Sequence, residues 1–322
     1  MSLKQNIKDF LKRILFNEDH PYFMMMRLAN WKKKMMRMTY SEIEAAISKQ
    51  YMETFGRPLN WDNPQTYNEK MQVSKLYMPT PEKTRLTDKY AVREWTAEKI
   101  GSEYLIPLLG VYDSFDKIDF DALPDQFVIK CNHDSGSYTI VRDKSKIDRK
   151  ALKLKYDRHM MMNYAFMTWD MHYKNIKPKI IIEQYLGDAI NEYKFYCFGG
   201  KPYYCFTTFG SRGINLTISF YDMDWQLQPF TRPDHKAHTE VAPRPAKYDE
   251  LKPIVSKLCE GFGHVRVDMY VVGGRIYAGE MTFTTCSGWG KLSPDEWDYK
   301  LGALWPFDSS VRSQVLAHSS RP

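Results

Sequence analysis

The stretch G-H-V-R-V-D-M-Y-V-V-G-G-R-I-Y-A-G-E-M-T-F-T-T-C-S-G runs from Gly263 to Gly288 and decides the fold. Two segments rich in β-branched and aromatic residues flank Gly273 and Gly274, a pattern that predicts a β-hairpin. Successive side chains along a strand point to opposite faces. One face is apolar and holds Val265, Val267, Met269, Val271, Tyr277, Gly279, Met281 and Phe283. The other face carries Arg266, Asp268, Glu280 and Thr282.

The register of the hairpin decides whether these four polar residues meet. A strict two-residue turn pairs residues of opposite parity, which would place Asp268 and Glu280 on opposite sides of the sheet. A three-residue loop with glycine in the left-handed position pairs residues of the same parity, that is even with even and odd with odd. Only that register gathers the apolar residues on one face, so we expect the three-residue loop.

Two carboxylates placed side by side repel one another unless a cation lies between them. Oxygen ligands without soft donors suit Mg2+, which usually binds substrate phosphates as well. Asp268, Glu280 and Thr282 are therefore candidate metal ligands. A solvated hairpin face with an Arg–Asp pair explains the same spacing equally well, so the rest of the chain has to decide.

The composition is that of a globular protein large enough for two or three packed units. The chain has 322 residues, 15% of them aromatic, and a net charge of +7. No segment approaches the ~20 apolar residues of a membrane span, and the N-terminus lacks the apolar core of a signal peptide. The five cysteines form no C-x-x-C pair, so we expect reduced thiols and a cytoplasmic location. The positive charge favours an acidic partner such as a nucleotide, an anionic polymer or a membrane surface.

Two basic clusters lie near the N-terminus. Residues 4–16 place apolar side chains at helical spacing, with basic side chains elsewhere on the helix. The second cluster comprises Lys32, Lys33, Lys34 and Arg37. Such a helix either lies on the anionic inner face of a membrane or packs on its own domain with its lysines in water. The second arrangement is the commoner one.

The first third of the chain is expected to be mostly helical. Thr66 and Glu69 form a capping box that opens a helix towards Tyr77. Thr87 is expected to cap another helix, which stops at Gly101. Further along, residues 148–174 indicate one long helix.

Strands prevail from residue 104 onwards. Apolar or alternating segments predict strands over 104–112, 127–130, 138–141, 180–186 and 192–198. Lys130 ends one of them and precedes the small polar loop C-N-H-D-S-G-S-Y, which could fold backbone N–H groups over phosphates. The loop is not a Walker A sequence, and a plain polar hairpin loop beside a surface lysine also explains it. Residues 309–322 show no clear apolar period, so we expect a disordered tail.

Several of these segments, in this order, resemble the TupA-like ATP-grasp family of surface-polysaccharide biosynthesis. They are N-P-Q-T-Y-N-E-K, D-K-Y-A-V-R, I-G-S-E-Y-L-I-P-L-L-G-V-Y-D, F-V-I-K-C-N-H-D-S-G-S, I-I-I-E-Q-Y-L, E-Y-K-F-Y-C-F-G-G-K-P and R-V-D-M-Y…G-E-M-T-F-T. The resemblance implies an α+β ATP-grasp fold, in which two α+β subdomains clamp ATP beside a mostly helical N-terminal domain. The implied divisions are a helical region 1–103, a small subdomain 104–187, a large subdomain 188–308 and the tail 309–322.

The resemblance also implies roles for individual residues. Lys130 would contact the α-phosphate, Glu183 the adenine amino group and Glu192 the ribose. The full set of implied ATP contacts is Lys89, Lys130, His133, Ser135, Gly136, Ser137, Glu183, Gln184, Tyr185, Leu186, Glu192 and Lys194. The implied catalytic residues are Arg266, Lys194 and Arg212, and the implied Mg2+ ligands are Asp268, Glu280 and Thr282. Many ATP-grasp enzymes have asparagine where this chain has Thr282, and a hydroxyl is a weaker metal ligand than an amide carbonyl.

The function implied by the resemblance is an ADP-forming carboxylate–amine ligase that uses ATP and Mg2+. It would join an amino acid or amine to a uronic-acid carboxyl of a capsular or cell-wall polysaccharide, or of its lipid- or nucleotide-linked precursor, through an acyl phosphate. No nucleic-acid partner is expected.

Three other interpretations stay open. A glycosyltransferase often carries an Asp-x-Asp metal motif, which Asp222 and Asp224 match formally, although a turn is the commoner meaning of that pattern. A sugar kinase would use the same ATP geometry. The third is a nucleotide-binding module without catalysis.

Overall fold

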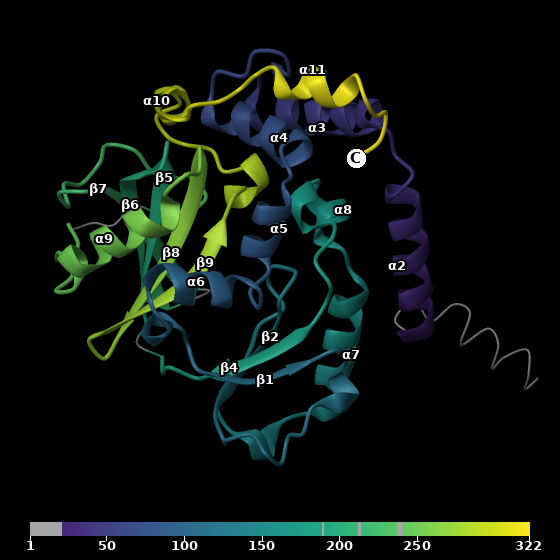
Figure 1. Ribbon diagram of the computed structural model, residues 1–322, viewed down its shortest axis with the longest axis vertical. Helices are drawn as coiled ribbons and strands as arrows, with labels where there is room; N and C mark the ends of the chain where they lie inside the picture. The colour runs from purple at the N-terminus through teal and green to yellow at the C-terminus, as the bar shows by residue number, and fades with distance from the viewer. Residues whose placement is uncertain (1–20, 189, 212–213, 237–240) are drawn as a thin grey trace, which may run out of the picture.

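The computed structural model describes residues 21–188, 190–211, 214–236 and 241–322. Within them the chain forms two antiparallel sheets, the larger at the left of Figure 1 and the smaller at the bottom, with a group of helices at the top. The expected α+β architecture is confirmed. No helix of these described residues has the length and apolar character needed to cross a membrane.

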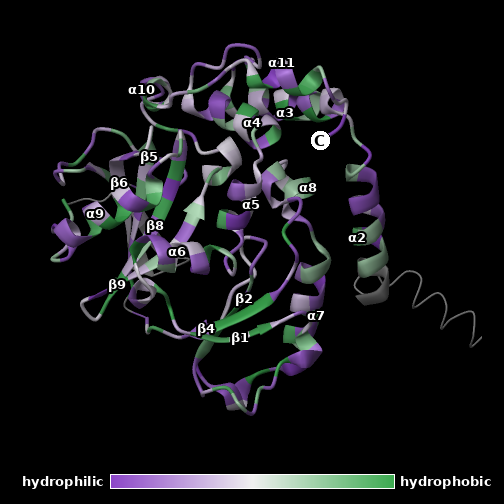
Figure 2. Cartoon of the chain, viewed as in Figure 1, coloured by the Kyte–Doolittle hydropathy of each residue, from purple (hydrophilic) through white to green (hydrophobic). Residues whose placement is uncertain are grey.

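The smaller sheet has four strands in the order β1-β4-β2-β3. They are β1 (Leu108–Tyr112), β4 (Ile180–Gln184), β2 (Phe127–Cys131) and β3 (Thr139–Val141). The two central strands, β4 and β2, are the most apolar part of this sheet (Figure 2). Helix α7 (Arg149–Met161) covers one face and is anchored by the buried Tyr156, whose hydroxyl donates to the Ile129 carbonyl oxygen at 2.8 Å.

The larger sheet has five strands in the order β7-β6-β5-β8-β9. They are β7 (Ile214–Asp222), β6 (Lys201–Ser211), β5 (Asn191–Phe198), β8 (His264–Val272) and β9 (Arg275–Thr282). Helix α9 (Tyr248–Cys259) packs on one face, and its Leu251, Val255 and Leu258 join Val265 and Val267 of β8 in the core. The charged side chains of β8 and β9 are thereby confined to the opposite face.

The register of the β8–β9 hairpin comes from a β-bulge. The expected three-residue loop was wrong: Val272 pairs with Arg275, and Gly273 and Gly274 form a two-residue turn with φ of 57° and 76°. Beyond Gly279, even-numbered residues of β8 pair with even-numbered residues of β9, because the register shifts at that glycine. Asp268 therefore lies directly opposite Glu280, as predicted.

The bulge also reverses the faces of the β9 residues between it and the turn, so that Ile276 and Ala278 share the apolar face with Met269. Tyr277 was expected on the apolar face with Met269, but it pairs with Tyr270 instead. Gly279 is the inserted residue, and a Cβ there would lie 2.7 Å from the Tyr270 ring and 2.9 Å from the Asp268 carbonyl oxygen. The bulge therefore has room for glycine at position 279 but not for a residue with a side chain.

The helices of the first third of the chain lie above, beside and between the two sheets (Figure 1). The first are α2 (Pro21–Met35), α3 (Tyr40–Phe55), α4 (Tyr67–Tyr77), α5 (Pro81–Thr87) and α6 (Val92–Ile100). The predicted capping box is confirmed: Thr66 and Glu69 satisfy each other's backbone N–H groups at the start of α4. The predicted cap at Thr87 was wrong, because Thr87 ends α5 and α6 begins after Ala91 with no side-chain cap.

Two other expectations about helices were wrong. The segment 148–174 is not one helix: α7 ends at Met161, and Asn163 caps the short α8 (Tyr164–Thr168) with its side-chain oxygen. The segment 309–322 is not disordered: α11 (Val311–Leu316) follows α10 (Glu296–Leu304) and packs on the helical core. Arg312 holds it there through both oxygens of Glu44, with N–O distances of 2.5 and 2.9 Å.

Candidate active site

A cleft between the two sheets gathers charged side chains from both. Its charged lining residues are Lys89, Arg93, Lys130, Glu183, Asp268 and Glu280. Five of these six were predicted from the sequence, and Arg93 was not. Apolar side chains such as Leu105, Ile106 and Met281 form the remaining wall. A cleft with apolar walls and converging charges is a typical ligand site.

On the larger sheet, Asp268 is the centre of a buried ion cluster. It is 1% exposed, and its Oδ1 accepts from Arg266 Nε at 2.6 Å. Its Oδ2 accepts from Arg266 Nη2 at 2.8 Å and from Lys194 Nζ at 2.7 Å. Burial by itself would raise the pKa of Asp268, but these two cations hold it below its ordinary value. Asp268 is therefore a carboxylate that stays ionised.

The strand register places the partners of Asp268. Lys194 lies on β5 opposite Asp268, and Thr282 lies on β9 opposite Arg266. Lys194 also binds Glu192 Oε1 at 2.6 Å, and Arg266 Nη2 donates to the Thr282 hydroxyl at 3.1 Å. The predicted residues Glu192, Lys194, Arg266 and Thr282 are thus all brought to one charged face.

Glu280 is the more open of the two carboxylates. Its side chain is 29% exposed and faces the Lys89 ammonium at an N–O distance of 3.5 Å. Lys89 Nζ also donates to the Asp134 carbonyl oxygen, so it links the larger sheet to the loop that follows β2. Among the described residues, no group of three or more histidine, cysteine, aspartate or glutamate side chains is arranged as a metal site. The predicted Mg2+ ligands stay a prediction.

On the smaller sheet, Glu183 is shared by two cations. Its Oε2 lies 2.6 Å from Lys130 Nζ on the neighbouring strand β2. Its Oε1 accepts from Arg93 Nη1 at 3.3 Å, and Arg93 Nη2 also donates to the Ile106 carbonyl oxygen at 2.7 Å. The sequence offered a signal for Arg93, because it lies four residues after Lys89 in the D-K-Y-A-V-R segment.

The predicted phosphate loop is held by its own side chains and by His159 of α7. Asp134 is 3% exposed and accepts from Ser137 Oγ at 2.6 Å, while its other oxygen lies 2.6 Å from His159 Nδ1. The buried His133 contacts the His159 carbonyl oxygen through Nε2 at 3.1 Å. The tip, Ser135 and Gly136, is exposed, and so is Tyr138 at the end of the loop. His133 and Ser137 therefore anchor the loop, and the sequence analysis missed the roles of Asp134 and His159.

The remaining predicted positions are placed less decisively. The backbone N–H of Gln184 donates to the Pro107 carbonyl oxygen at 2.9 Å, so this donor is already used. Tyr185 and Leu186 follow the end of β4. Arg212 lies outside the described residues. Asp222 ends β7 and accepts from the N–H groups of Asp224 and Gln226 at 2.9 Å each, which supports a turn at the Asp-x-Asp pattern.

The donor set fits a nucleotide with a divalent cation. The cations Lys89, Arg93 and Lys130 face Glu183 or Glu280 in the cleft, and phosphate groups could take over these contacts. Two carboxylates directly opposite each other, one of them partly open, match the way Mg2+ binds beside substrate phosphates. Asp268 and Glu280 would hold that ion, with Thr282 adjacent.

Known proteins of similar structure have low identity to this chain. A D-alanine–D-alanine ligase from Bacillus anthracis is 19% identical, with 72% of this chain and 67% of that chain covered and a TM-score of 0.40. An N5-carboxyaminoimidazole synthetase from Staphylococcus aureus complexed with ADP is 14% identical, with coverages of 61% and 43% and a TM-score of 0.33. The ATP-grasp ligase PsnB is 8% identical, with coverages of 70% and 60% and a TM-score of 0.39. Likeness at this level carries no functional argument.

A comparison with curated proteins finds no match. A family model gives the decisive result: the TupA-like ATPgrasp model matches residues 69–305, which includes both sheets and every charged residue of the cleft. The α+β arrangement of the two sheets agrees with that assignment. The chain belongs to the TupA-like ATPgrasp family and has the ATP-grasp fold.

Proposed function

We propose that this protein is an ATP-dependent ligase that joins an amine to a carboxylate, with ADP and phosphate as products. The observation that carries the proposal is the cleft, whose lining brings the cations Lys89, Arg93 and Lys130 together with the opposed pair Asp268–Glu280 of the larger sheet. Family membership supports ATP as the nucleotide. The amide product and the identity of both substrates are finer parts of the same proposal.

The reaction needs charge compensation more than a protein nucleophile. A substrate carboxylate oxygen attacks the γ-phosphorus, and ADP leaves; an amine then attacks the acyl carbon, loses a proton and expels phosphate. ATP and Mg2+ supply the leaving group and its charge neutralisation. Arg266 is held rigidly by Asp268, so its guanidinium is preorganised for the negative charge that develops on the reacting carboxyl. Lys194 is held the same way.

The role of Arg266 is tested by Arg266→Ala. Removing one preorganised donor to a developing oxyanion typically lowers the rate by about 100- to 1000-fold. Nucleotide affinity should change much less, since Arg266 points to Asp268 and Thr282 rather than to the smaller sheet. Unchanged turnover in a folded variant with normal nucleotide affinity would refute this role.

For the carboxylate we propose a uronic acid of a surface polysaccharide or of its lipid- or nucleotide-linked precursor, and for the amine an amino acid or a simple amine. The net charge of +7 supports an acidic substrate. The experiment is a screen for ADP release with uronates and amines, separately and together. The ligase predicts release that requires both. Release with neither, or with a hydroxyl acceptor alone, points to hydrolysis or to a sugar kinase and overturns the proposal.

A glycosyltransferase is the second candidate, and it is favoured only by the Asp-x-Asp pattern. Asp222 uses its carboxylate to bind the backbone of its own turn, and neither Asp222 nor Asp224 lines the cleft. Competition between ATP and a UDP-sugar without a carboxyl group separates the two functions, because the ligase should bind only the adenine nucleotide at its nucleotide site.

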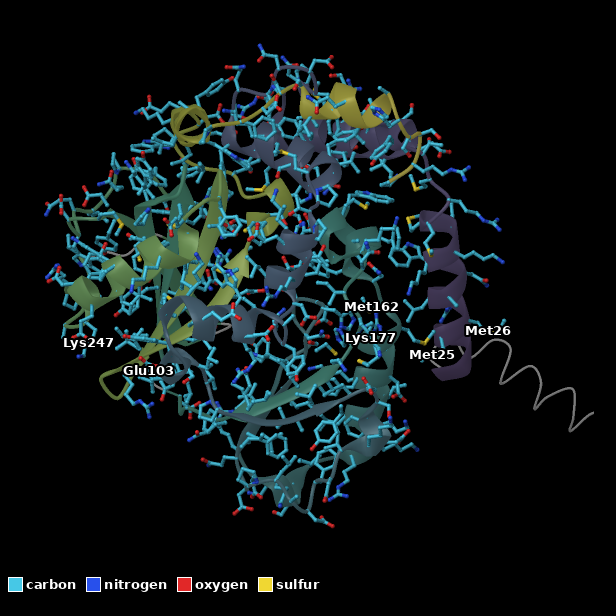
Figure 3. All side chains as sticks on the ribbon, viewed as in Figure 1. Met25, Met26, Glu103, Met162, Lys177 and Lys247 are labelled. Atoms are coloured by element: carbon cyan, nitrogen blue, oxygen red, sulfur yellow. The ribbon has the colours of Figure 1, made fainter. Side chains whose placement is uncertain are left out.

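We also propose a weak contact of the N-terminal region with an anionic membrane surface. Residues 4–16 lie outside the described residues, but the last turn of α2 carries the three lysines of the second basic cluster, and Arg37 follows the helix. Residues 21–41 include no acidic residue. Met25 and Met26 lie on α2 at the edge of the molecule (Figure 3). An open groove beside them is lined by Ala29, Lys32, Lys33, Met36, Arg37 and Met161. Cations beside exposed methionines suit an interfacial helix.

Vesicle binding tests this contact. The full chain should sediment with phosphatidylglycerol vesicles and not with phosphatidylcholine vesicles. Replacing Lys32, Lys33 and Lys34 with glutamine should weaken binding by roughly 100-fold, at about 1 kcal/mol per lysine near the surface. The matched control replaces three exposed lysines elsewhere, Lys201, Lys257 and Lys291. Equal losses in both triple variants would show only a net-charge effect.

A further inference from the structure

Lys89 differs from the other cations of the cleft in how its backbone is held. Lys130 lies on strand β2 and Arg93 on helix α6, where regular backbone hydrogen bonds fix both residues. Lys89 lies in the turn between α5 and α6, outside either helix. Its ammonium nevertheless has a defined place, between Glu280 at 3.5 Å and the Asp134 carbonyl oxygen. Other groups therefore have to hold the backbone from which this side chain starts.

Asn132 is one of these groups, and Asp88 is the other. Asn132 follows β2 directly and is 0% exposed, and its carbonyl oxygen accepts from the Lys89 N–H at 3.1 Å. Its side-chain amide donates to Asp88 Oδ1 at 2.8 Å. The same oxygen of Asp88 accepts from the Tyr90 N–H at 2.8 Å, which closes the turn around Lys89. The Asp88–Asn132 pair thus holds the backbone on both sides of Lys89.

The amide of Asn132 is itself fixed by a third segment, which leads into β4. Its Oδ1 accepts from the Lys179 N–H at 2.7 Å, and its Nδ2 also donates to the Lys177 carbonyl oxygen at 3.1 Å. The backbone N–H of Asn132 donates to the Lys179 carbonyl oxygen at 3.1 Å, which extends the pairing of β2 with β4. Both donors and the acceptor of the amide are therefore in use, so its orientation is set by the smaller sheet.

This arrangement connects the position of Lys89 to the smaller sheet. Neither Asp88 nor Asn132 lines the cleft, whereas Lys89 does. An effect of the Asp88–Asn132 pair on a bound nucleotide therefore has to pass through a neighbour. Lys89 is the neighbour whose ammonium lies in the cleft, and an ammonium there is suited to bind phosphate oxygens.

We infer that Asp88 and Asn132 are positioning residues for the phosphates of the nucleotide: they set the place of the Lys89 ammonium in the cleft. This inference rests on the proposed function, since it takes the nucleotide to bind between the sheets. It also gives two distant segments a common purpose. D-K-Y-A-V-R supplies the lysine, and F-V-I-K-C-N-H-D-S-G-S supplies the asparagine that holds it.

A double-mutant cycle separates positioning of Lys89 from a general structural role. Binding of a non-hydrolysable ATP analogue with Mg2+ is measured by calorimetry for wild type, Asn132→Ala, Lys89→Met and the double variant. Lys89→Met should weaken binding at least about tenfold, through loss of a charged contact with phosphate. Asn132→Ala should weaken it by about three- to tenfold, because the ammonium is kept but displaced. Adding Asn132→Ala to Lys89→Met should weaken binding by less than about twofold more, because the two residues act as one unit.

A second ligand and a matched control sharpen the cycle. Adenosine, which has no phosphate, should bind Asn132→Ala and wild type with affinities within about twofold. The control is Asn163→Ala, because the Asn163 amide also links two segments, donating to the Lys174 carbonyl oxygen at 2.9 Å and accepting from the Ala165 N–H at 3.1 Å. None of these three residues lines the cleft, so both affinities should stay unchanged. If Asn132→Ala fails to fold, Asp88→Ala removes the same contact at a partly exposed residue and carries the same cycle.

Hydrogen exchange of residues 88–92 in the nucleotide-free protein supplies a readout that does not depend on binding. Exchange should become about tenfold faster in Asn132→Ala and stay unchanged in Asn163→Ala. Equal exchange in Asn132→Ala and wild type, or equal losses of affinity for the analogue and for adenosine, overturns the inference. So does a full additional loss in the double variant, which would mean that Asn132 acts through the adjoining His133 and not through Lys89. Failure of the wild-type protein to bind the analogue, together with the predicted exchange difference, counts against the proposed function and not against the hold of Asn132 on Lys89.

Discussion

The two sheets of this protein hold their charges in different ways. On the larger sheet, Asp268 is 1% exposed, and both of its oxygens bind cations that the strand register places beside it. On the smaller sheet, Glu183 is shared between Lys130 on the adjacent strand and Arg93 on helix α6. The larger sheet therefore fixes the charges around Asp268 by register, whereas its Glu280 faces Lys89 from outside the sheet. The smaller sheet depends on a docked helix, and its ion pairs are the ones that a ligand can rearrange.

The largest effect should follow from Asp268→Asn. The change leaves the charges of Arg266 and Lys194 without their carboxylate in a buried site, and breaking a buried pair in this way costs about 3–5 kcal/mol of unfolding free energy. Urea unfolding at pH 7 measures it. A loss under 1 kcal/mol would mean that this cluster is hydrated and not fixed by the sheet.

The same residue predicts a pH dependence. Because the pKa of Asp268 is lowered in the folded protein, its contribution to stability is complete above the ordinary value of about 3.9 and is lost as the pH falls through the folded value. The difference in unfolding free energy between wild type and Asp268→Asn should stay constant from about pH 7 to pH 5 and shrink below about pH 4. A gap that closes near pH 6 would contradict the lowered pKa.

Glu183→Gln should have a smaller effect than Asp268→Asn. The amide keeps the shape and can still accept one hydrogen bond, and the two cations can turn to solvent because Lys130 is 21% and Arg93 15% exposed. We expect a loss of about 1–3 kcal/mol in urea unfolding. A loss larger than that of Asp268→Asn would reverse the comparison between the two sheets.

Gly279→Ala tests whether the bulge fixes the register of the larger sheet. The new Cβ would lie within 3 Å of the Tyr270 ring and the Asp268 carbonyl oxygen, and such overpacking costs about 1–3 kcal/mol. Gly290→Ala is the control, because its Cβ would meet Cys286 at an ordinary 3.4 Å, and it should change stability by less than about 0.5 kcal/mol. Similar values for both variants would show that the bulge tolerates a side chain.

The smallest effect on stability should come from Glu280→Gln. Glu280 is partly exposed and has one ion pair at 3.5 Å, so its removal should change the unfolding free energy by at most about 1 kcal/mol. Its effect should instead appear in the Mg2+ dependence of nucleotide binding, measured by titrating Mg2+ at a fixed nucleotide concentration. An unaltered Mg2+ dependence would remove Glu280 from the ion site.

The hairpin shows what a sequence pattern can and cannot predict. The apolar and charged faces predicted correctly that Asp268 and Glu280 meet, because burial of one face constrains the register. The three-residue loop was predicted wrongly, because the register is set by a bulge at Gly279. No local signal distinguishes a glycine that permits a bulge from one that merely weakens a strand. Burial of the apolar face thus requires Asp268 and Glu280 to pair. The position of the bulge depends on glycine at 279, where a Cβ would collide with the Tyr270 ring.

Contacts between distant segments were the main omission. Arg93 reaches Glu183 only because α6 docks beside the smaller sheet, and the lone segment D-K-Y-A-V-R predicts a helix without a partner. The C-terminal α11 is too short for a periodic pattern, and it is stabilised by the ion pair of Arg312 with Glu44. A local segment can point to such a residue, but its partner follows only from the fold.

Binding of a non-hydrolysable ATP analogue in the presence of Mg2+, measured by calorimetry, tests the central claim most directly. The account predicts one site per chain, binding that weakens at least about tenfold in Lys130→Met through loss of a charged contact with phosphate, and no competition by a UDP-sugar without a carboxyl group. Equal affinity in Lys130→Met and wild type, or preference for the UDP-sugar, would place the nucleotide outside the cleft between the sheets and contradict the account.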